Sequence, residues 1–325
     1  MKQYLSIIAA AVCANAVMHA HAQTETYPSR PIRLIVPFSP GSSTNDILGR
    51  GLAQRMTLAL GQQVVVDNRA GAGGTSGSEI VAKAPPDGYT LLVAIAGPLT
   101  VAPAVYKQIG YDATRDFAAV ARIAIIPYVM VVTNSLPAQN VKELIALAKA
   151  KPRSINFASS GVGSSPHLCG ELFNTVAATD MVHVPYKGAG VATTDVLSGQ
   201  IQMFCSGLTA LNALIKAGRM RPIGMATLKR SALMPDIPTI NEQGLKDFEV
   251  TSWTGIVAPA KTPRAIVQKL YGTLAKITQT DDMKTFVQQQ GAEMALLGPE
   301  AFAADIKSDI AKWAKLIKTA KIQPE

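Results

Sequence analysis

A regular alternation of two kinds of segment constrains the fold of this chain more than any other feature. Short apolar runs such as 32–38 have the composition of buried strands, and longer segments such as 46–60 carry apolar residues at helical spacing. Further strands are expected near 64–67, 90–94, 127–133, 154–159, 181–185, 201–205, 221–226 and 254–259. Further helices are expected near 75–83, 141–150, 166–177, 189–198, 209–217, 263–278, 281–289 and 299–320, and another is expected to begin at 97–98. Alternating strands and helices predict an α/β fold, with parallel-rich sheets that carry helices on both faces.

The first 22 residues predict export rather than structure. Lys2 is followed by an apolar run from Leu5 to Val17, and then by the small-residue pattern 20–22. These three parts in this order are typical of a secretory signal peptide, cleaved here after about Ala22. A lipid-modified Cys13 and an uncleaved anchor are the weaker alternatives.

The composition excludes several classes of protein. Loss of the leader would leave two histidines, His167 and His183, and two cysteines, Cys169 and Cys205, which are too few for a metal site. The formal net charge is +9, but the basic residues are scattered and aromatics make up only 6%, which disfavours a nucleic-acid partner. Because the cysteines fall on separate predicted elements, we expect two free thiols, although an oxidising compartment would also permit a disulfide bond.

Three loops share the same chemistry. The segments 39–46, 96–98 and 159–166 each follow a predicted strand and begin a predicted helix, and they are rich in Gly, Ser and Thr. In the third loop, Ser165 is the expected N-cap and Pro166 the first helical residue. Free amides at a helix start favour an anion. No Lys or Arg lies within these loops, so a carboxylate is expected rather than a phosphate, and simple helix capping is the alternative.

Motifs for catalysis or nucleotide binding are weak. The glycine-rich segment 71–77 resembles a dinucleotide fingerprint, but Ser76 occupies the third glycine position, which favours a structural turn. The chain has no G-x-S-x-G motif, and His167 has no evident acidic partner for a triad, so we expect no enzyme. His183 lies in a buried-strand pattern and is interpreted as a core residue.

Five segments together resemble the Bug/TctC family, the extracytoplasmic receptors of tripartite tricarboxylate transporters. The segments are YPSRPIR (27–33), VVDNRAGAGG (65–74), PDGYTLL (86–92), HVPYKG (183–188) and PDIPT (235–239), and the resemblance covers nearly the whole mature chain. The resemblance implies a type II periplasmic-binding-protein fold, in which two α/β lobes close on a ligand in a cleft. The expected limits are 1–22 for the signal peptide, 23–124 plus 226–325 for lobe 1 and 125–225 for lobe 2.

The same resemblance implies a function. It implies a monomeric receptor in the periplasm that captures a small organic carboxylate and delivers it to integral-membrane permease subunits, without cofactor, metal or catalysis. A periplasmic sensor that presents the carboxylate to a signalling partner is the alternative. The residues expected to bind the ligand are Phe38, Ser39, Gly41, Ser42, Ser43, Thr44, Asn45, Asp46, Gly97, Ser159, Ser160, Gly163, Ser164, Ser165, His167, Tyr186, Cys205 and Ser206.

Two departures from the family pattern concern the expected pocket. The first loop carries Ser42 where the family has a second glycine, and it is one residue longer before Asp46. Cys205 and Ser206 stand where the family often has Phe and Asp. Loss of a bulky wall and of a carboxylate would leave more room and less negative charge, so a larger anionic ligand is expected to fit.

Overall fold

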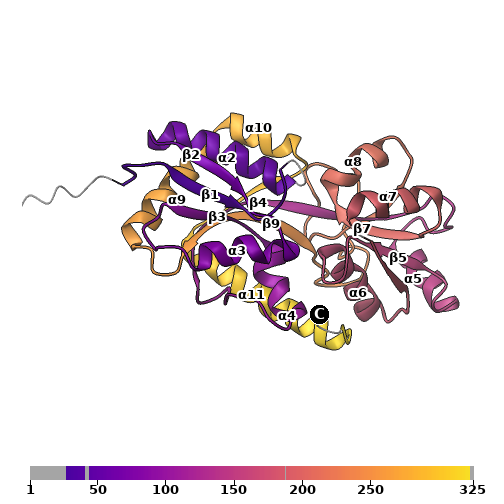
Figure 1. Cartoon of the computed structure of the whole chain (residues 1–325). Helices are drawn as coiled ribbons and strands as arrows, with labels where there is room; N and C mark the ends of the chain where they lie inside the picture. The colour runs from indigo at the N-terminus through magenta and orange to yellow at the C-terminus, as the bar shows by residue number, and fades with distance from the viewer. Residues whose placement is uncertain (1–26, 41–43, 187, 323–325) are drawn as a thin grey trace, which may run out of the picture.

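The computed structural model describes residues 27–40, 44–186 and 188–322. The predicted signal peptide and three of the expected ligand-binding residues, Gly41, Ser42 and Ser43, lie outside these ranges. Two groups of strands and helices lie side by side and share one long strand, as Figure 1 shows. The α/β class predicted from the alternation of segments is confirmed, and each of the two groups forms one lobe.

The first lobe is built on strands whose side chains alternate between two cores. Its strands are β2 (Val64–Asn68), β1 (Ile32–Val36), β3 (Thr90–Ile95), β9 (Thr251–Pro259), the first part of β4 and the edge strand β10 (Glu293–Leu297). Leu34 and Val36 pack under α2 (Thr44–Leu60), α9 (Arg264–Gln279) and α10 (Asp281–Gln289). Ile35 faces the opposite layer, which contains α3 (Thr75–Ala82) and the start of α11. The period of two along a strand thus gives the lobe helices on both faces.

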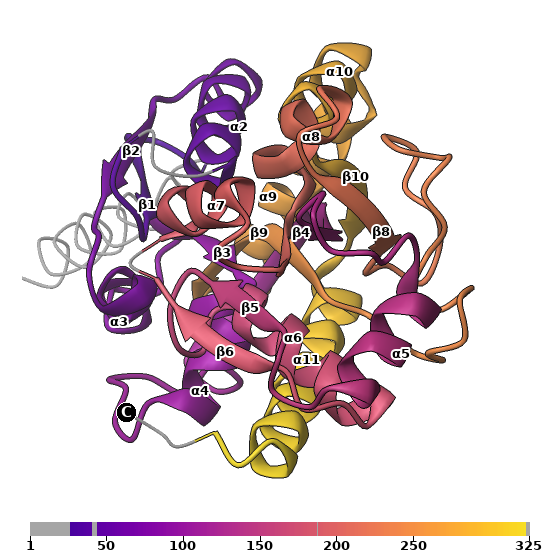
Figure 2. The same cartoon turned by 90° about the vertical axis from the view of Figure 1, so that its right-hand side faces the viewer.

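The second lobe repeats this arrangement. Its strands are β6 (Val182–Pro185), β5 (Asn156–Ser159), β7 (Met203–Gly207), β8 (Arg221–Met225) and the second part of β4. One core lies beneath α5 (Val141–Ala150) and α6 (Ser165–Ala177), and the other lies beneath α7 (Ala189–Ser198) and α8 (Leu208–Lys216). Figure 2 shows the helices of this lobe on both sides of its strands. From the carboxyl ends of the parallel strands β5 and β6, the chain passes through short loops into α6 and α7.

The two lobes share strand β4 (Phe117–Val132). Residues 117–127 of β4 pair with β9, and residues 128–132 pair with β7, so one strand belongs to both lobes. Every ladder of β4 and β9 among the described residues is antiparallel, whereas β1–β2, β1–β3, β5–β6 and β5–β7 are parallel. The sheet is therefore mixed: parallel at the outer strands, as expected, and antiparallel where the lobes meet. The predicted strand at 127–133 is only the last part of β4.

A long C-terminal helix also belongs to both lobes. In α11 (Pro299–Thr319), Phe302 and Ile306 pack into a core of the first lobe, and Trp313, Leu316 and Ile317 pack into a core of the second. Figure 1 shows this helix running beneath both groups of strands. It is long enough to reach both, because each residue adds about 1.5 Å of length. The lobes are therefore connected by a helix as well as by β4.

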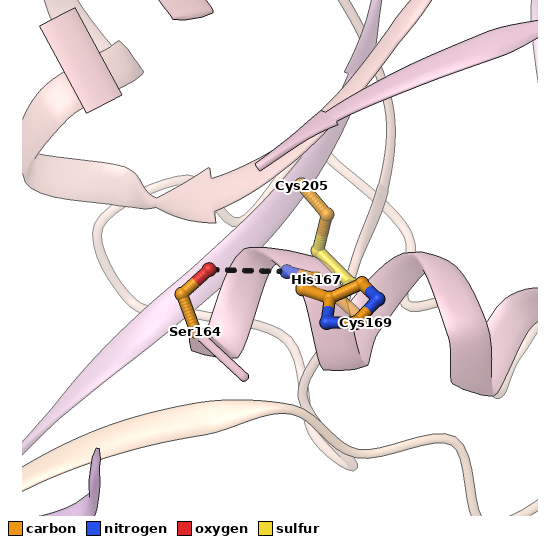
Figure 3. Close-up of a disulfide and its surroundings, with 4 residues drawn as sticks. All are labelled: Ser164, His167, Cys169 and Cys205. Atoms are coloured by element: carbon orange, nitrogen blue, oxygen red, sulfur yellow. Dashed lines mark hydrogen bonds between the residues drawn. A yellow bond between two sulfur atoms is a disulfide. The ribbon is translucent and has the colours of Figure 1, made fainter. Parts of the chain in front are cut away.

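A disulfide bond joins α6 to β7 and corrects the expectation of two free thiols. Cys169 lies one turn into α6 and Cys205 lies in β7, and their Cα atoms are 6.1 Å apart, as Figure 3 illustrates. Both residues are buried, at 0% and 1% exposure. Separate elements do not keep cysteines apart when the fold packs one element on the other, which is what α6 and β7 do.

Candidate functional site

The loop between β5 and α6 is shaped by glycines and by a serine cap. Gly163 has a positive φ of 72°, and a Cβ atom there would lie only 2.6 Å from the side chain of Val105. The N-cap of α6 is Ser164, one residue earlier than expected. Its hydroxyl accepts a hydrogen bond from the His167 amide at 3.5 Å and donates one to the Gly161 carbonyl at 2.7 Å. Residues 160–165 are half-buried, so their polar groups are accessible in part.

Two histidines hydrogen-bond residues of this loop or of the strand before it. Ser159 is fully buried, and its Oγ hydrogen-bonds His183 Nε2 at 2.6 Å. His167, which is 4% exposed, accepts a hydrogen bond from the Gly163 amide at its Nδ1, at 3.0 Å. Ser159 and His167 are therefore buried, and both hydrogen-bond to neighbouring residues of the protein. His183, which the sequence indicated as a core residue, is a further part of this hydrogen-bonded arrangement.

Two tyrosines in the second lobe are held in their neutral form. Burial raises the pKa of the Tyr128 phenol, which lies near the side chain of Ser165. The Tyr186 hydroxyl donates to Asp195 Oδ2 at 2.6 Å. Burial, followed by the hydrogen bond and the charge of Asp195, raises the pKa of Tyr186 to about 12. Both phenols are therefore hydrogen-bond donors at neutral pH.

In the first lobe, the start of α2 is tied to neighbouring strands. Thr44 is the first residue of α2 and is half-buried. The Thr254 hydroxyl on β9 donates to Asn45 Oδ1. Asp46 is fully buried, and its carboxylate accepts from Asn68 Nδ2 at 2.7 Å and from Arg50 Nε at 3.1 Å. The Asp46 carboxylate therefore joins α2 to β2, while Thr44 and Asn45 define how the helix begins.

The remaining expected residues of this lobe differ in exposure. Phe38 is half-buried and its carbonyl accepts from Asn68 Nδ2 at 2.7 Å, whereas Ser39 is exposed. Gly97 begins the π-helical turn η2 (Gly97–Val101), which continues into α4 (Ala102–Val105). A Cβ atom at Gly97 would meet no other atom within 4 Å, so open space adjoins this backbone. Such a position allows a ligand to approach the main chain closely.

Strand β4 relates the two loops in space. Thr254, which bonds Asn45, lies opposite Ala124 of β4, and Tyr128, which lies near Ser165, is four residues further along the same strand. Four residues of a strand span about 13 Å. Val105 of the first lobe also lies directly against Gly163 of the second. Thus the helix starts that the sequence indicated in separate halves of the chain both lie near one short stretch of β4, and the start of α2 is bonded to the adjacent strand β9.

Two expected residues lie at the carboxyl end of β7. The sulfur of Cys205 is bonded to Cys169 within a core of the second lobe. Ser206, the next residue, is 5% exposed and pairs with Val129 of β4. Extra room was expected at position 205, where the family often has phenylalanine. The disulfide bond fills part of that room.

Sequence analysis did not identify Thr254, Tyr128 and His183 as site residues. Each lies within a strand rather than in a glycine-rich loop, so no local pattern distinguished it. Within the described ranges, no group of three or more His, Cys, Asp or Glu residues could hold a metal ion. None of the helices in those ranges has the length and apolar character needed to cross a membrane.

Comparison with known proteins gives a consistent result. Residues 48–322 match the model of the tripartite tricarboxylate transporter family receptor, TctC. A UPF0065 protein encoded in the tcbD-tcbE intergenic region of Pseudomonas sp. (strain P51) is 39% identical over 90% of this chain and 87% of its own length. Rpa4515 of R. palustris, solved with adipate, is 36% identical, with a TM-score of 0.81 over 92% of this chain and all of that one. MatC from Rhodopseudomonas palustris, solved with bound malate, is 29% identical, with a TM-score of 0.75 over 90% of this chain and all of its own.

Proposed function

The chain belongs to the tripartite tricarboxylate transporter receptor family, TctC, and we propose that it is a periplasmic receptor for a small organic carboxylate. The ligand binds between the lobes, whose proposed limits are 23–124 plus 226–325 and 125–225. The loaded receptor then delivers the ligand to the integral-membrane permease subunits of such a transporter. The protein acts as a monomer and without catalysis or a cofactor.

One observation carries this proposal. Helices α2 and α6 begin in different lobes, and both starts lie near β4: Asn45 bonds Thr254 of β9, which lies opposite Ala124, and Ser165 lies near Tyr128, four residues further along β4. Each start offers amides and hydroxyls and the positive end of a helix dipole, which favours a carboxylate. A ligand with one carboxylate, or with one at each end, can contact both starts together.

The related structures support a dicarboxylate as the ligand class. Rpa4515 was solved with adipate and MatC with malate. Each of these ligands carries two carboxylates on a short carbon chain. In this chain, the neutral phenol of Tyr128 adds a hydroxyl near the α6 loop without adding negative charge. We therefore propose a dicarboxylate of about the size of malate or adipate.

Thermal unfolding with matched ligands tests the proposal. Adipate and malate are compared with the corresponding diamides, which have the same shape and no charge. A bound ligand at 100 times its dissociation constant raises the free energy of unfolding by about 2.7 kcal/mol. At roughly 2–4 °C per kcal/mol for a chain of this size, the melting temperature should rise by about 5–10 °C. A rise with the dicarboxylates alone supports the proposal, and no rise with any carboxylate of a wider panel would contradict it.

Delivery is tested in cells. Uptake of the carboxylate that binds is measured with and without this chain, in cells that contain the permease subunits. The proposal predicts that uptake requires the chain. Unchanged uptake, together with a changed transcriptional response to the same carboxylate, would instead indicate the sensor.

A further inference from the structure

A stack of three rings lies beneath the loop that begins α6. The rings of His167 and His183 are stacked with centroids 3.8 Å apart and an interplanar angle of 17°. His183 stacks in turn on Phe157, with centroids 5.1 Å apart. The stack therefore fixes the orientation of the buried His167 ring, and with it the direction of both ring nitrogens.

Each nitrogen of His167 has a defined polar neighbour. Nδ1 accepts a hydrogen bond from the Gly163 amide at 3.0 Å, and an imidazole nitrogen accepts only while it carries no proton. Nε2 faces Glu171 Oε1 at 3.7 Å. The neutral ring therefore carries its proton on Nε2, on the side of the acidic residue.

Two titratable groups of the described chain face this ring: Glu171 on the same helix and His183 on β6. Burial, followed by the neighbouring His167, lowers the pKa of His183 to about 3. His183 thus stays neutral at the pH values at which imidazoles ordinarily titrate.

We propose that His167 is a positioning residue for the carboxylate site, whose unprotonated Nδ1 holds the Gly163 amide and so gives the 160–164 loop the shape in which Ser164 meets the ligand. The inference rests on the function proposed above. A side chain without an acceptor at position 167 cannot hold the Gly163 amide and releases the loop. Carboxylate affinity therefore depends on an acceptor at this position.

The first test needs no ligand. Long-range proton–nitrogen NMR spectra of the histidine rings at about pH 8 should show His167 with its proton on Nε2 and none on Nδ1. The Gly163 amide resonance should move in His167→Leu, which has no acceptor. It should stay close to its wild-type position in His167→Asn, because the side-chain oxygen can take the place of Nδ1. A proton on Nδ1 at about pH 8, or a Gly163 resonance unchanged in His167→Leu, would overturn the inference.

The second test measures adipate affinity by calorimetry in the wild type and in the two variants. His167→Leu should bind roughly three- to tenfold more weakly than the wild type, which is the effect of one lost hydrogen bond. His167→Asn should keep the affinity of the wild type, because it keeps an acceptor for the Gly163 amide.

The outcomes of the second test separate the two proposals. Equal affinity in His167→Leu and the wild type would overturn the role of His167. Equal losses in His167→Asn and His167→Leu would mean that the acceptor is not what matters, which also overturns it. No binding of adipate or other carboxylates by the wild type would count against the proposed function, whereas the ring spectra would still decide the role of His167.

Discussion

Ser164 combines two roles at the residue scale: it caps α6, and it is proposed to meet the ligand. Ser164→Ala should lower the free energy of unfolding by about 1 kcal/mol, because the cap is lost. It should also weaken carboxylate binding by about tenfold or more, since a hydrogen bond to a charged group contributes about 1.5–3 kcal/mol. The ligand oxygen would replace the Gly161 carbonyl that now accepts from Ser164.

Asn140→Ala is the matched control for this variant. Asn140 caps α5 by accepting from the Glu143 amide at 3.0 Å, in the same lobe but on another helix. It should lose similar stability and retain full affinity. Equal affinity in Ser164→Ala and Asn140→Ala, measured by calorimetry, would remove Ser164 from the site. Thr44→Ala tests the start of α2 in the same way.

The disulfide bond gives a second prediction for single residues. Cys169→Ala should lower the free energy of unfolding by about 3–4 kcal/mol, as expected for a bond between residues 36 positions apart. In the wild type, thiol labelling followed by peptide mass spectrometry should modify neither cysteine until the protein is both unfolded and reduced, because both are buried. Labelling of both cysteines without reductant in denaturant would show that the bond does not form.

The cysteine pair also shows what sequence could not predict at this scale. The glycines and serines of the α6 loop were identified because helix starts have a local signature. Cys169 and Cys205 share no local pattern, and their pairing depends on α6 packing against β7. Likewise, His167 was recognised as part of the loop, but its bond to Gly163 depends on a ring orientation fixed by His183.

At the scale of elements, two tryptophans test how α11 is held. Trp313 of α11 is buried in a core of the second lobe, and its indole nitrogen has no hydrogen-bond partner in the described structure. Trp253 of β9 donates from its indole nitrogen to Asp309 of α11 at 2.9 Å. Trp313→Phe should therefore lower the free energy of unfolding by little beyond the effect of lost volume. Trp253→Phe should lower it by about 1–3 kcal/mol more, because it leaves the half-buried Asp309 carboxylate without its indole donor.

Chemical denaturation of the two variants measures this difference. Trp313→Ala provides the reference for full loss of packing, with an expected cost of about 3–5 kcal/mol. If the two phenylalanine variants were equally stable, the bond between β9 and α11 would contribute nothing. If Trp313→Ala were as stable as the wild type, the end of α11 would not be part of the second core.

The elements differ in how far they could be predicted. Helices such as 141–150 and 281–289 were predicted at their observed limits because apolar spacing and capping residues mark them. The first part of β4 was missed, because the run 117–126 is apolar on both faces and lacks the alternation of a half-buried strand. Arg122, in the middle of this run, is paired with Asp305 of α11 at 2.7 Å, a partner that sequence cannot supply. The edge strand β10 depends in the same way on pairing with β4.

At the scale of the whole molecule, the shared strand and the shared helix predict closure. Backbone rotation where β4 passes from one lobe to the other would move the lobes as rigid bodies. A carboxylate that contacts both helix starts favours the conformation in which they are close, and this differential contact shifts the equilibrium. Small-angle scattering should therefore show a smaller radius of gyration with a bound carboxylate than without it. An equal radius, with binding confirmed, would indicate a site that is closed before the ligand arrives.

The proposal that both lobes hold one carboxylate is tested most directly by an NMR titration of the backbone amides with the dicarboxylate that binds most tightly. We predict that amides at the start of α2, including Asn45, and amides at the start of α6, including Ser165, shift together and fit a single dissociation constant. Shifts confined to one of these helix starts, with the other unchanged at saturation, would contradict the proposal.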